Sequence, residues 1–371
     1  MWPKKQIKGV MLGGSKLGSE VPPPVKPKLE LAKIAKPKKL RKLPEEILKE
    51  KERERVNGKK PEPPENVPRP MNDKRAVMVG SMFDREGALT AAANFNPATW
   101  EIDDLWLNPD NRNEIQPDKL IVFFGKRRTG KSFCARHLAY TGRALFNYGM
   151  VLCDTKFNQY WQKYFPRDYV HEFDPIILRM FIDQQGKEVE SWILAGEPRK
   201  WNPYKLIILD DVVSPNFRYV EEVTTFATKG RHYRTCVFLM TQYPRLIATS
   251  TRVNTDFAFI FFQQNILEKE AIATEYLNMI PKEAAMHLVE KHTQVEEDDQ
   301  QRTILVINLM ANTIQLERKV FTYEPVDPGE FVVGSPDFWK DDDRYVTMVT
   351  KGAFDAWITY NLAVTGERQI V

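Results

Sequence analysis

The sequence contains few cysteines and lacks any long apolar run. Its three cysteines, Cys134, Cys153 and Cys236, stand at unrelated spacings, which excludes a disulfide framework and a cysteine-based zinc site. No apolar run approaches the roughly 20 residues that cross a bilayer, and the first residues lack the apolar core of a signal peptide. These absences predict a soluble protein of a reducing compartment, with each thiol buried beside an apolar run.

Charge is distributed unevenly along the 371 residues. Residues 1–75 hold 21 Lys and Arg against 10 Asp and Glu, whereas the remainder holds 33 against 40. Twelve of the 25 prolines also occur by residue 70. Such a segment buries too little apolar surface to offset the cost of ordering, so we expect 1–75 to be a disordered basic tail. It is either a solvating extension or an arm that contacts nucleic acid or an acidic partner.

The rest of the chain predicts an α/β fold. Residues 76–118 indicate an irregular lead-in with a short helix near Gly87–Ala93. From Lys119, apolar runs alternate with helix-length stretches, which is typical of a mainly parallel central sheet flanked by helices. The runs are continuously hydrophobic, as in strands that are covered on both faces. The expected strands are Leu120–Phe124, Met150–Cys153, Leu206–Leu209, Cys236–Met240 and Phe257–Phe262; the expected helices are Lys131–Phe146, Pro175–Ala195, Asn216–Lys229, Ile266–Leu277 and Pro281–Lys291.

The end of the chain is less regular. After an acidic loop at Glu296–Gln301, the runs Thr303–Asn308 and Thr313–Leu316 predict a hairpin that turns through Met310–Asn312. We expect residues 119–324 to form the main α/β domain. Residues 325–371 would form a small C-terminal extension, helical or irregular.

A phosphate-binding loop is the strongest motif. The pattern G-x-x-x-x-G-K-[S/T] follows an expected strand directly and opens an expected helix, which is the context that the motif requires. Gly125 and Gly130 allow backbone N–H groups to converge on phosphates, and the helix N-terminus adds partial positive charge. Lys131 would reach the β- and γ-phosphates, and the Ser132 hydroxyl would bind Mg²⁺. The whole loop is Gly125, Lys126, Arg127, Arg128, Thr129, Gly130, Lys131 and Ser132.

Two adjacent carboxylates follow another buried strand. Leu206–Leu209 would deliver Asp210 to the edge of the sheet, where its carboxylate can hold Mg²⁺ directly or through water. Asp211 is the candidate to orient or deprotonate an attacking water. Either aspartate could instead cap the following helix, since Asp is favoured at that position. The second carboxylate favours hydrolysis over transfer to another substrate.

Three further polar segments lie around the next strand: Gly230-Arg231-His232 before it, Thr241-Gln242-Tyr243-Pro244 at its end, and Arg252-Val253-Asn254-Thr255-Asp256 after it. Gln242, at the tip of the strand, can sense the γ-phosphate or position water. It could equally cap a helix or pair with the backbone.

Together these motifs resemble the FtsK–HerA superfamily of P-loop DNA-translocating ATPases. More narrowly, they are similar to the genome-packaging ATPases of large nucleocytoplasmic DNA viruses. The resemblance depends on the order of the Lys/Arg-rich loop, the paired acids and the three polar segments. It covers roughly residues 119–264, with a weaker continuation to about 324. One departure is Arg127-Arg128-Thr129, where relatives usually carry a small residue.

The resemblance implies ATP and Mg²⁺ as cofactors, with Asp211 and Gln242 in catalysis. It also implies a homo-oligomeric ring of five or six subunits, in which an arginine completes the ATP site of its neighbour. Arg252 and Arg231 are the candidates for this arginine, because a guanidinium can stabilise charge on the transferred phosphoryl group. The implied partners are double-stranded DNA, bound without sequence specificity, and capsid or vertex proteins. No membrane insertion is expected, and the location would be the virion or the viral factory in the host cytoplasm.

Three functions are compatible with these motifs. The leading hypothesis is an ATP-hydrolysing translocase that packages a viral genome into its capsid. The second is a cellular or plasmid translocase or helicase of the same superfamily, and the third is a slow nucleotide-binding assembly protein without motor activity. For the first, Lys156, Lys163 and the stretch 199–205 are candidates to grip the DNA backbone, with the basic tail as a further one.

Overall fold

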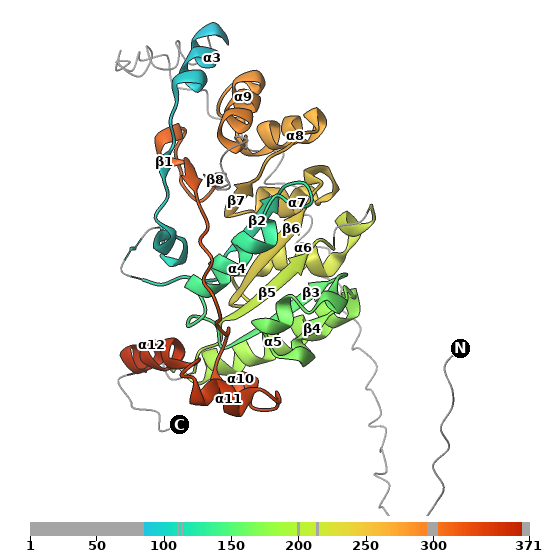
Figure 1. Cartoon of the computed structure of the whole chain (residues 1–371), viewed down its shortest axis with the longest axis vertical. Helices are drawn as coiled ribbons and strands as arrows, with labels where there is room; N and C mark the ends of the chain where they lie inside the picture. Colours follow the sequence, from blue (N-terminus) through green and yellow to red (C-terminus); the bar gives the residue numbers. More distant parts are fainter. Residues whose placement is uncertain are drawn as a thin grey trace, which may run out of the picture. The chain divides into compact units, whose positions relative to one another are not determined.

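The computed structural model describes residues 85–365, except 110, 113, 199–200, 213–214 and 295–302. The expected tail and the acidic loop therefore lie outside the described residues. Within them, nine strands form one sheet in the order β1-β9-β8-β7-β2-β6-β5-β3-β4 (Figure 1). This arrangement confirms the predicted α/β class with a mainly parallel sheet.

The five central strands coincide with the five expected ones and all run parallel. In sheet order they are β7 (Phe257–Ile260), β2 (Leu120–Phe124), β6 (Thr235–Thr241), β5 (Lys205–Asp210) and β3 (Tyr148–Cys153). Their continuous hydrophobicity has the expected cause, because successive residues point to opposite faces and both faces are covered. In β2, for example, Ile121 and Phe123 enter one cluster, whereas Leu120, Val122 and Phe124 enter the other.

Helices cover both faces of the sheet. One face packs against α4 (Lys131–Thr141), together with Trp100 and Trp106 from the lead-in and Trp339 from the C-terminal part. The lead-in also contains α3 (Arg85–Asn94) and a 3₁₀ turn at Ile102–Trp106. The other face packs against four helices, which are α5 (Pro175–Leu194), α6 (Glu221–Lys229), α8 (Ile266–Tyr276) and α9 (Lys282–Thr293).

The hairpin prediction was correct for its first strand and wrong for its second. β8 (Ile304–Asn308) pairs antiparallel with β9, which is Val320–Tyr323 and not the expected Thr313–Leu316. Ile314 is 60% exposed, so that earlier run lacks the burial that a strand of this sheet requires. Val320 and Tyr323 are buried, and β9 continues the sheet to β1 (Ala98–Thr99).

Two helices are shorter than expected. α4 ends at Thr141 and not at Phe146. The next residue is Gly142, where an added Cβ would come within 2.7 Å of the Trp106 ring, so a larger residue does not fit against the lead-in there. A 3₁₀ turn at Phe217–Tyr219 precedes α6, so that helix begins at Glu221 and not at Asn216.

The C-terminal part of the described chain is helical. It contains α10 (Pro336–Trp339), α11 (Tyr345–Thr350) and α12 (Asp355–Thr365). Phe331, Val333 and Trp339 are buried in the same cluster as α4. At the other edge of the sheet, the short strand β4 (Val170–His171) pairs with β3.

The structure also bears on the absences in the sequence. In the parts of the chain that are described, no helix is long and apolar enough to cross a membrane. All three cysteines are buried free thiols, as expected. Burial raises the pKa of the Cys153 thiol to about 12, so this group stays protonated at neutral pH.

Candidate functional site

The phosphate loop joins β2 to α4 at the carboxyl edge of the parallel strands. Gly130 has a φ of 98°, which side-chain-bearing residues seldom adopt. Gly125 is required for a different reason: an added Cβ would lie 2.6 Å from Phe261 Cβ and 2.7 Å from Thr129 Oγ1. Both glycines of the motif therefore have a backbone function that alanine cannot supply.

The side chain of Lys131 is folded over the loop. Its Nζ donates to the carbonyl oxygens of Gly125 at 2.7 Å and Lys126 at 3.1 Å. Burial lowers the pKa of the amine, while the carboxylates of Asp211 and Asp210 act in the opposite direction. The amine is thus held beside the loop by neutral carbonyl groups, which phosphate oxygens can replace as stronger, charged acceptors.

Ser132 and Asp210 meet across the edge of the sheet. The Ser132 hydroxyl lies 3.3 and 3.2 Å from the two carboxylate oxygens of Asp210, although β6 separates β2 from β5 in the sheet. Asp210 is only 9% exposed; burial raises its pKa, and the hydrogen bonds from Trp161 and Ser132 act against this shift. Neither oxygen bonds to a helix N-terminus in the contacts described, so Asp210 faces the loop and does not act as a cap.

This pair fits a magnesium ion. A hydroxyl and a carboxylate are hard oxygen ligands, and Mg²⁺ typically uses one or two such groups together with phosphate oxygens and water. Among the described residues there is no group of three or more His, Cys, Asp and Glu side chains that could hold a metal without a nucleotide. The residues present therefore suit a cation that arrives with a bound triphosphate.

Asp211 and Gln242 form the second pair of the site. Gln242 Nε2 donates to both carboxylate oxygens of Asp211, at 2.9 and 3.1 Å. Asp211 has a φ of 57°, a left-handed conformation that Asp tolerates better than most residues. Neither Asp211 nor Gln242 caps the helix that follows it. The N-cap of α6 is Val220, the N-cap of the 3₁₀ turn Pro244–Leu246 is Tyr243, and neither start has a side-chain cap.

The remaining loop side chains have separate partners. Lys126 donates to the Gln264 side chain at 2.9 Å, and the Thr129 hydroxyl donates back to the Lys126 carbonyl at 2.8 Å. Arg127 lies 3.8 Å from Asp211 in an ion pair that is largely exposed on the arginine side. Arg128 adopts a left-handed conformation, with a φ of 65°.

Arg231 lies at the opposite edge of the sheet from the phosphate loop. It follows α6 and precedes β6, where its guanidinium forms an ion pair with the buried Asp256 just before β7. β6 contains 7 residues, so its two ends are separated by roughly 20 Å. The fold therefore does not bring Arg231 to the phosphate loop of its own chain.

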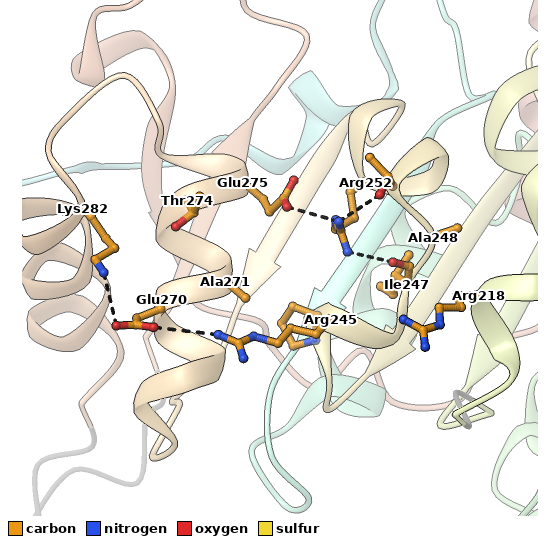
Figure 2. Close-up of a pocket in the computed structure, with 12 residues that line it drawn as sticks. Arg218, Arg245, Ile247, Ala248, Arg252, Glu270, Ala271, Thr274, Glu275 and Lys282 are labelled. Atoms are coloured by element: carbon orange, nitrogen blue, oxygen red, sulfur yellow. Dashed lines mark hydrogen bonds and ion pairs between the residues drawn. The ribbon is translucent and has the colours of Figure 1, made fainter.

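Arg252 is fixed within its own chain as well. It lies on α7 (Thr249–Val253), donates to the Ile247 carbonyl at 2.9 Å and pairs with Glu275 at 3.2 Å. Figure 2 shows this side chain directed at Glu275, on the wall of a pocket of about 440 Å³. On the same wall, Glu270 forms ion pairs with Arg245 at 3.8 Å and Lys282 at 3.3 Å. Among the contacts described, Arg218 has only the ring of Tyr219 as a partner. The arginine candidates thus do not contact the phosphate loop within one chain.

The expectation that Lys205 could contact DNA was wrong. Lys205 is 5% exposed, belongs to β5 and pairs with Glu188, so it is not available to a DNA backbone. Lys163 is exposed and Lys156 is half-buried, both in the segment that follows β3. Arg199 lies outside the described residues.

No sequence motif pointed to Trp161. Its indole Nε1 donates to Asp210 Oδ2 at 2.7 Å, and the ring is only 2% exposed. The adjacent Tyr160 hydroxyl donates to the Ser132 carbonyl at 3.2 Å. These two aromatic residues belong to no motif that we identified, and only the position of their segment directly after a central strand could have pointed to the site.

The chain is similar in sequence to several viral proteins. The uncharacterized protein L437 of Acanthamoeba polyphaga mimivirus is 27% identical over 244 residues, which cover 63% of this chain and 81% of that protein. The uncharacterized protein 075L of Invertebrate iridescent virus 6 is 31% identical over 188 residues, 47% of this chain and 67% of that protein. The chain belongs to the family of protein 075L. None of the protein-family models searched matches it.

Likeness to solved structures is more distant. The genome packaging NTPase B204 from Sulfolobus turreted icosahedral virus 2, in complex with ATP-gammaS, is 16% identical with a TM-score of 0.39, covering 57% of this chain and all of that one. The pCW3 conjugation coupling protein TcpA is 9% identical with a TM-score of 0.44, covering 70% and 75%. The functional assignment of the site therefore depends on its own residues.

Proposed function

We propose that this protein hydrolyses ATP and uses the energy to move double-stranded DNA, as the motor that packages a viral genome. The observation that carries the proposal is the meeting of two pairs at one edge of the sheet, Ser132 with Asp210 and Gln242 with Asp211, beside the phosphate loop. The motif combination of the FtsK–HerA superfamily and membership of a family of viral proteins support the DNA-motor reading.

The protein groups divide the chemistry among them. The loop N–H groups and Lys131 would bind the β- and γ-phosphates, and Ser132 and Asp210 would hold Mg²⁺. The bound Mg²⁺ would neutralise charge that develops on the phosphates during hydrolysis. Asp211 would orient the attacking water and accept its proton, with its carboxylate fixed by the two hydrogen bonds from Gln242.

Gln242 would also report whether the γ-phosphate is present. Its amide is bonded to Asp211 in the structure, and a γ-phosphate oxygen or the attacking water would compete for the same N–H groups. Gln242 directly follows β6, and the chain continues from it into the segment with Arg245 and Arg252. A change at Gln242 would therefore reach the residues that we expect at a subunit interface, which is how hydrolysis would drive movement in a ring of five or six.

The proposal is tested by ATPase activity with and without DNA. We expect purified protein to hydrolyse ATP slowly alone and several-fold faster with duplex DNA of any sequence, and we expect the stimulation to fall steeply with salt. Mass measurement with ATPγS should show the ring. Hydrolysis that DNA does not change, with assembly that depends on nucleotide, would instead identify the slow assembly protein. The viral family disfavours the cellular or plasmid translocase.

A further inference from the structure

Asp210 receives a hydrogen bond from a residue that none of the motifs contains. Trp161 Nε1 lies 2.7 Å from Asp210 Oδ2, and both side chains are almost completely shielded from solvent, at 2% and 9% exposure. A buried hydrogen bond to an ionised carboxylate is among the stronger kinds, and its direction is well defined. The indole therefore fixes the orientation of the Asp210 carboxylate about its last rotatable bond.

The chemistry of the indole suits this position. It donates one proton and carries no charge, so it orients the carboxylate without neutralising it. A lysine or arginine at the same place would compete with a metal cation for the charge of Asp210. The Ser132 hydroxyl contacts the same carboxylate, so a cation that comes with the nucleotide would meet Asp210 beside Ser132.

Trp161 is itself held by the C-terminal part of the chain. Arg344 donates to the carbonyl oxygens of Gln162 and, at 3.2 Å, of Phe165. The Val333 N–H donates to the Tyr164 carbonyl at 3.1 Å, and the Tyr164 ring stacks on Phe331 with centroids 4.6 Å apart. The segment 160–165 is thus clamped between the Asp210 carboxylate on one side and residues 331–344 on the other.

We infer that Trp161 is a positioning residue for nucleotide-bound Mg²⁺, acting through Asp210 and anchored by the C-terminal extension. This inference rests on the proposed ATP site but adds a residue and a segment that the site motifs do not contain. Partners of metal ligands typically contribute 10- to 100-fold to metal affinity, because they orient the ligand. It also connects residues 331–344 to the nucleotide site through Trp161 and Asp210.

The test is the substitution Trp161→Phe, which keeps an aromatic ring but removes the N–H group. The matched control is Trp192→Phe on α5, where the indole donates to the Pro198 carbonyl at 3.4 Å, away from the loop. Binding of ATPγS is measured by calorimetry at a series of Mg²⁺ concentrations. We expect the Mg²⁺ concentration for half-maximal binding to rise about 10- to 100-fold in Trp161→Phe and to stay unchanged in Trp192→Phe.

Intrinsic fluorescence supplies a second readout. Mg²⁺ with ATPγS should change the tryptophan emission of the unsubstituted protein and of Trp192→Phe, and the change should be absent in Trp161→Phe. A third variant, Arg344→Lys, removes the two-pronged clamp and leaves Trp161 in place; a smaller shift of the Mg²⁺ dependence in the same direction is expected.

Each outcome has a distinct meaning. An unshifted Mg²⁺ dependence in Trp161→Phe, or an equal shift in both tryptophan variants, would overturn the inference. If Trp161→Phe does not fold, the test uses the indole N–H resonance of Trp161 in the unsubstituted, ¹⁵N-labelled protein. A change in its chemical shift on adding Mg²⁺ and ATPγS supports the inference, and an unchanged shift refutes it. Failure of the unsubstituted protein to bind Mg²⁺ and ATPγS at all would instead refute the proposed function.

Discussion

Gln242, which follows β6, donates hydrogen bonds of 2.9 and 3.1 Å to both carboxylate oxygens of Asp211, which follows β5. Paired donation of this kind holds the carboxylate in one plane, while the left-handed backbone of Asp211 turns it away from the strand direction. The arrangement orients a carboxylate at the edge of the sheet where the phosphate loop lies.

Asp211→Asn should therefore bind ATP as the unsubstituted protein does but lose turnover. An amide cannot accept the proton of the attacking water, and loss of a general base typically lowers kcat by about 10²- to 10⁴-fold. Steady-state hydrolysis and ATPγS binding should be measured together, with Asp183→Asn on the exposed side of α5 as the control. Unchanged hydrolysis would remove Asp211 from the catalytic residues.

Lys131→Ala should abolish nucleotide binding while the fold remains intact. The amine contacts only the carbonyl oxygens of Gly125 and Lys126 in the described contacts, so its removal costs the fold little. It is also the cation that the motif directs at the β- and γ-phosphates. Calorimetry with ATPγS and the midpoint of thermal unfolding would separate the two effects, with the exposed Lys187→Ala on α5 for comparison. Full affinity in Lys131→Ala would place the nucleotide elsewhere.

Gly130→Ala should weaken both the fold and nucleotide binding. An alanine in the left-handed conformation of Gly130 costs about 1–2 kcal/mol, and relief of that strain would move the loop N–H groups. Gly196→Ala is a matched control, because Gly196 has a φ of 81° and nothing within 4 Å of an added Cβ. Both variants should unfold at lower temperature, but only Gly130→Ala should lose affinity for ATPγS. Equal nucleotide binding in the two would contradict a role of loop geometry.

Much of the site follows from local sequence. The phosphate loop, the aspartate pair and Gln242 all stand next to buried strands, and parallel strands bring their carboxyl ends to one edge. Strand identity was predictable because residues covered on both faces are continuously apolar. The positions of Ser132 and Asp210 were therefore implied before their contact was visible.

Other features depend on contacts between distant segments. Trp161 meets Asp210 because the segment after β3 returns to the end of the neighbouring strand β5, and no spacing rule encodes that path. Gly142, the residue after α4, lies against Trp106 of the lead-in, a contact that local sequence does not reveal. The strand that pairs with β8 is β9 and not the expected run Thr313–Leu316. Burial by the rest of the fold, and not hydrophobicity over four residues, decides which run joins β8. Lys205 also looked like a surface cation and is buried by its place in β5.

His137 predicts a loss of stability at mildly acidic pH. Its Nδ1 lies 2.5 Å from the Tyr323 hydroxyl and accepts a hydrogen bond from the Val326 N–H at 3.3 Å, and burial, with Arg136 adding to it, lowers the pKa of the imidazole. The unfolded state thus binds a proton more readily than the folded state. The contribution is complete above the unfolded pKa of about 6.5 and is lost as the pH falls from there through the lower folded value.

The free energy of unfolding should accordingly decrease between pH 7 and pH 5, by at most about 1.4 kcal/mol per pH unit for one such group. His137→Asn keeps an acceptor near Nδ1 and removes the titration, so its unfolding midpoint in urea should change less over this range. His171 and His292, whose pKa values are also lowered by burial, would supply the slope that remains. Parallel pH profiles of the two proteins would show that the pKa of His137 does not change on folding, which would contradict the prediction.

Arg252→Ala tests whether an arginine acts on the neighbouring subunit. Arg252 and Lys131 do not meet in one chain, so each single variant should be inactive in a ring for a different reason. Mixing Arg252→Ala with Lys131→Ala should restore part of the ATPase activity, because some interfaces then combine an intact loop with an intact arginine. Glu275→Gln is the intrachain control: it breaks the 3.2 Å ion pair and leaves the guanidinium. If Glu275→Gln reproduces the loss of ATPase activity and mixing restores nothing at any ratio, the role of Arg252 is to stabilise α7 against α8. The same mixing experiment with Arg231→Ala then tests the other candidate.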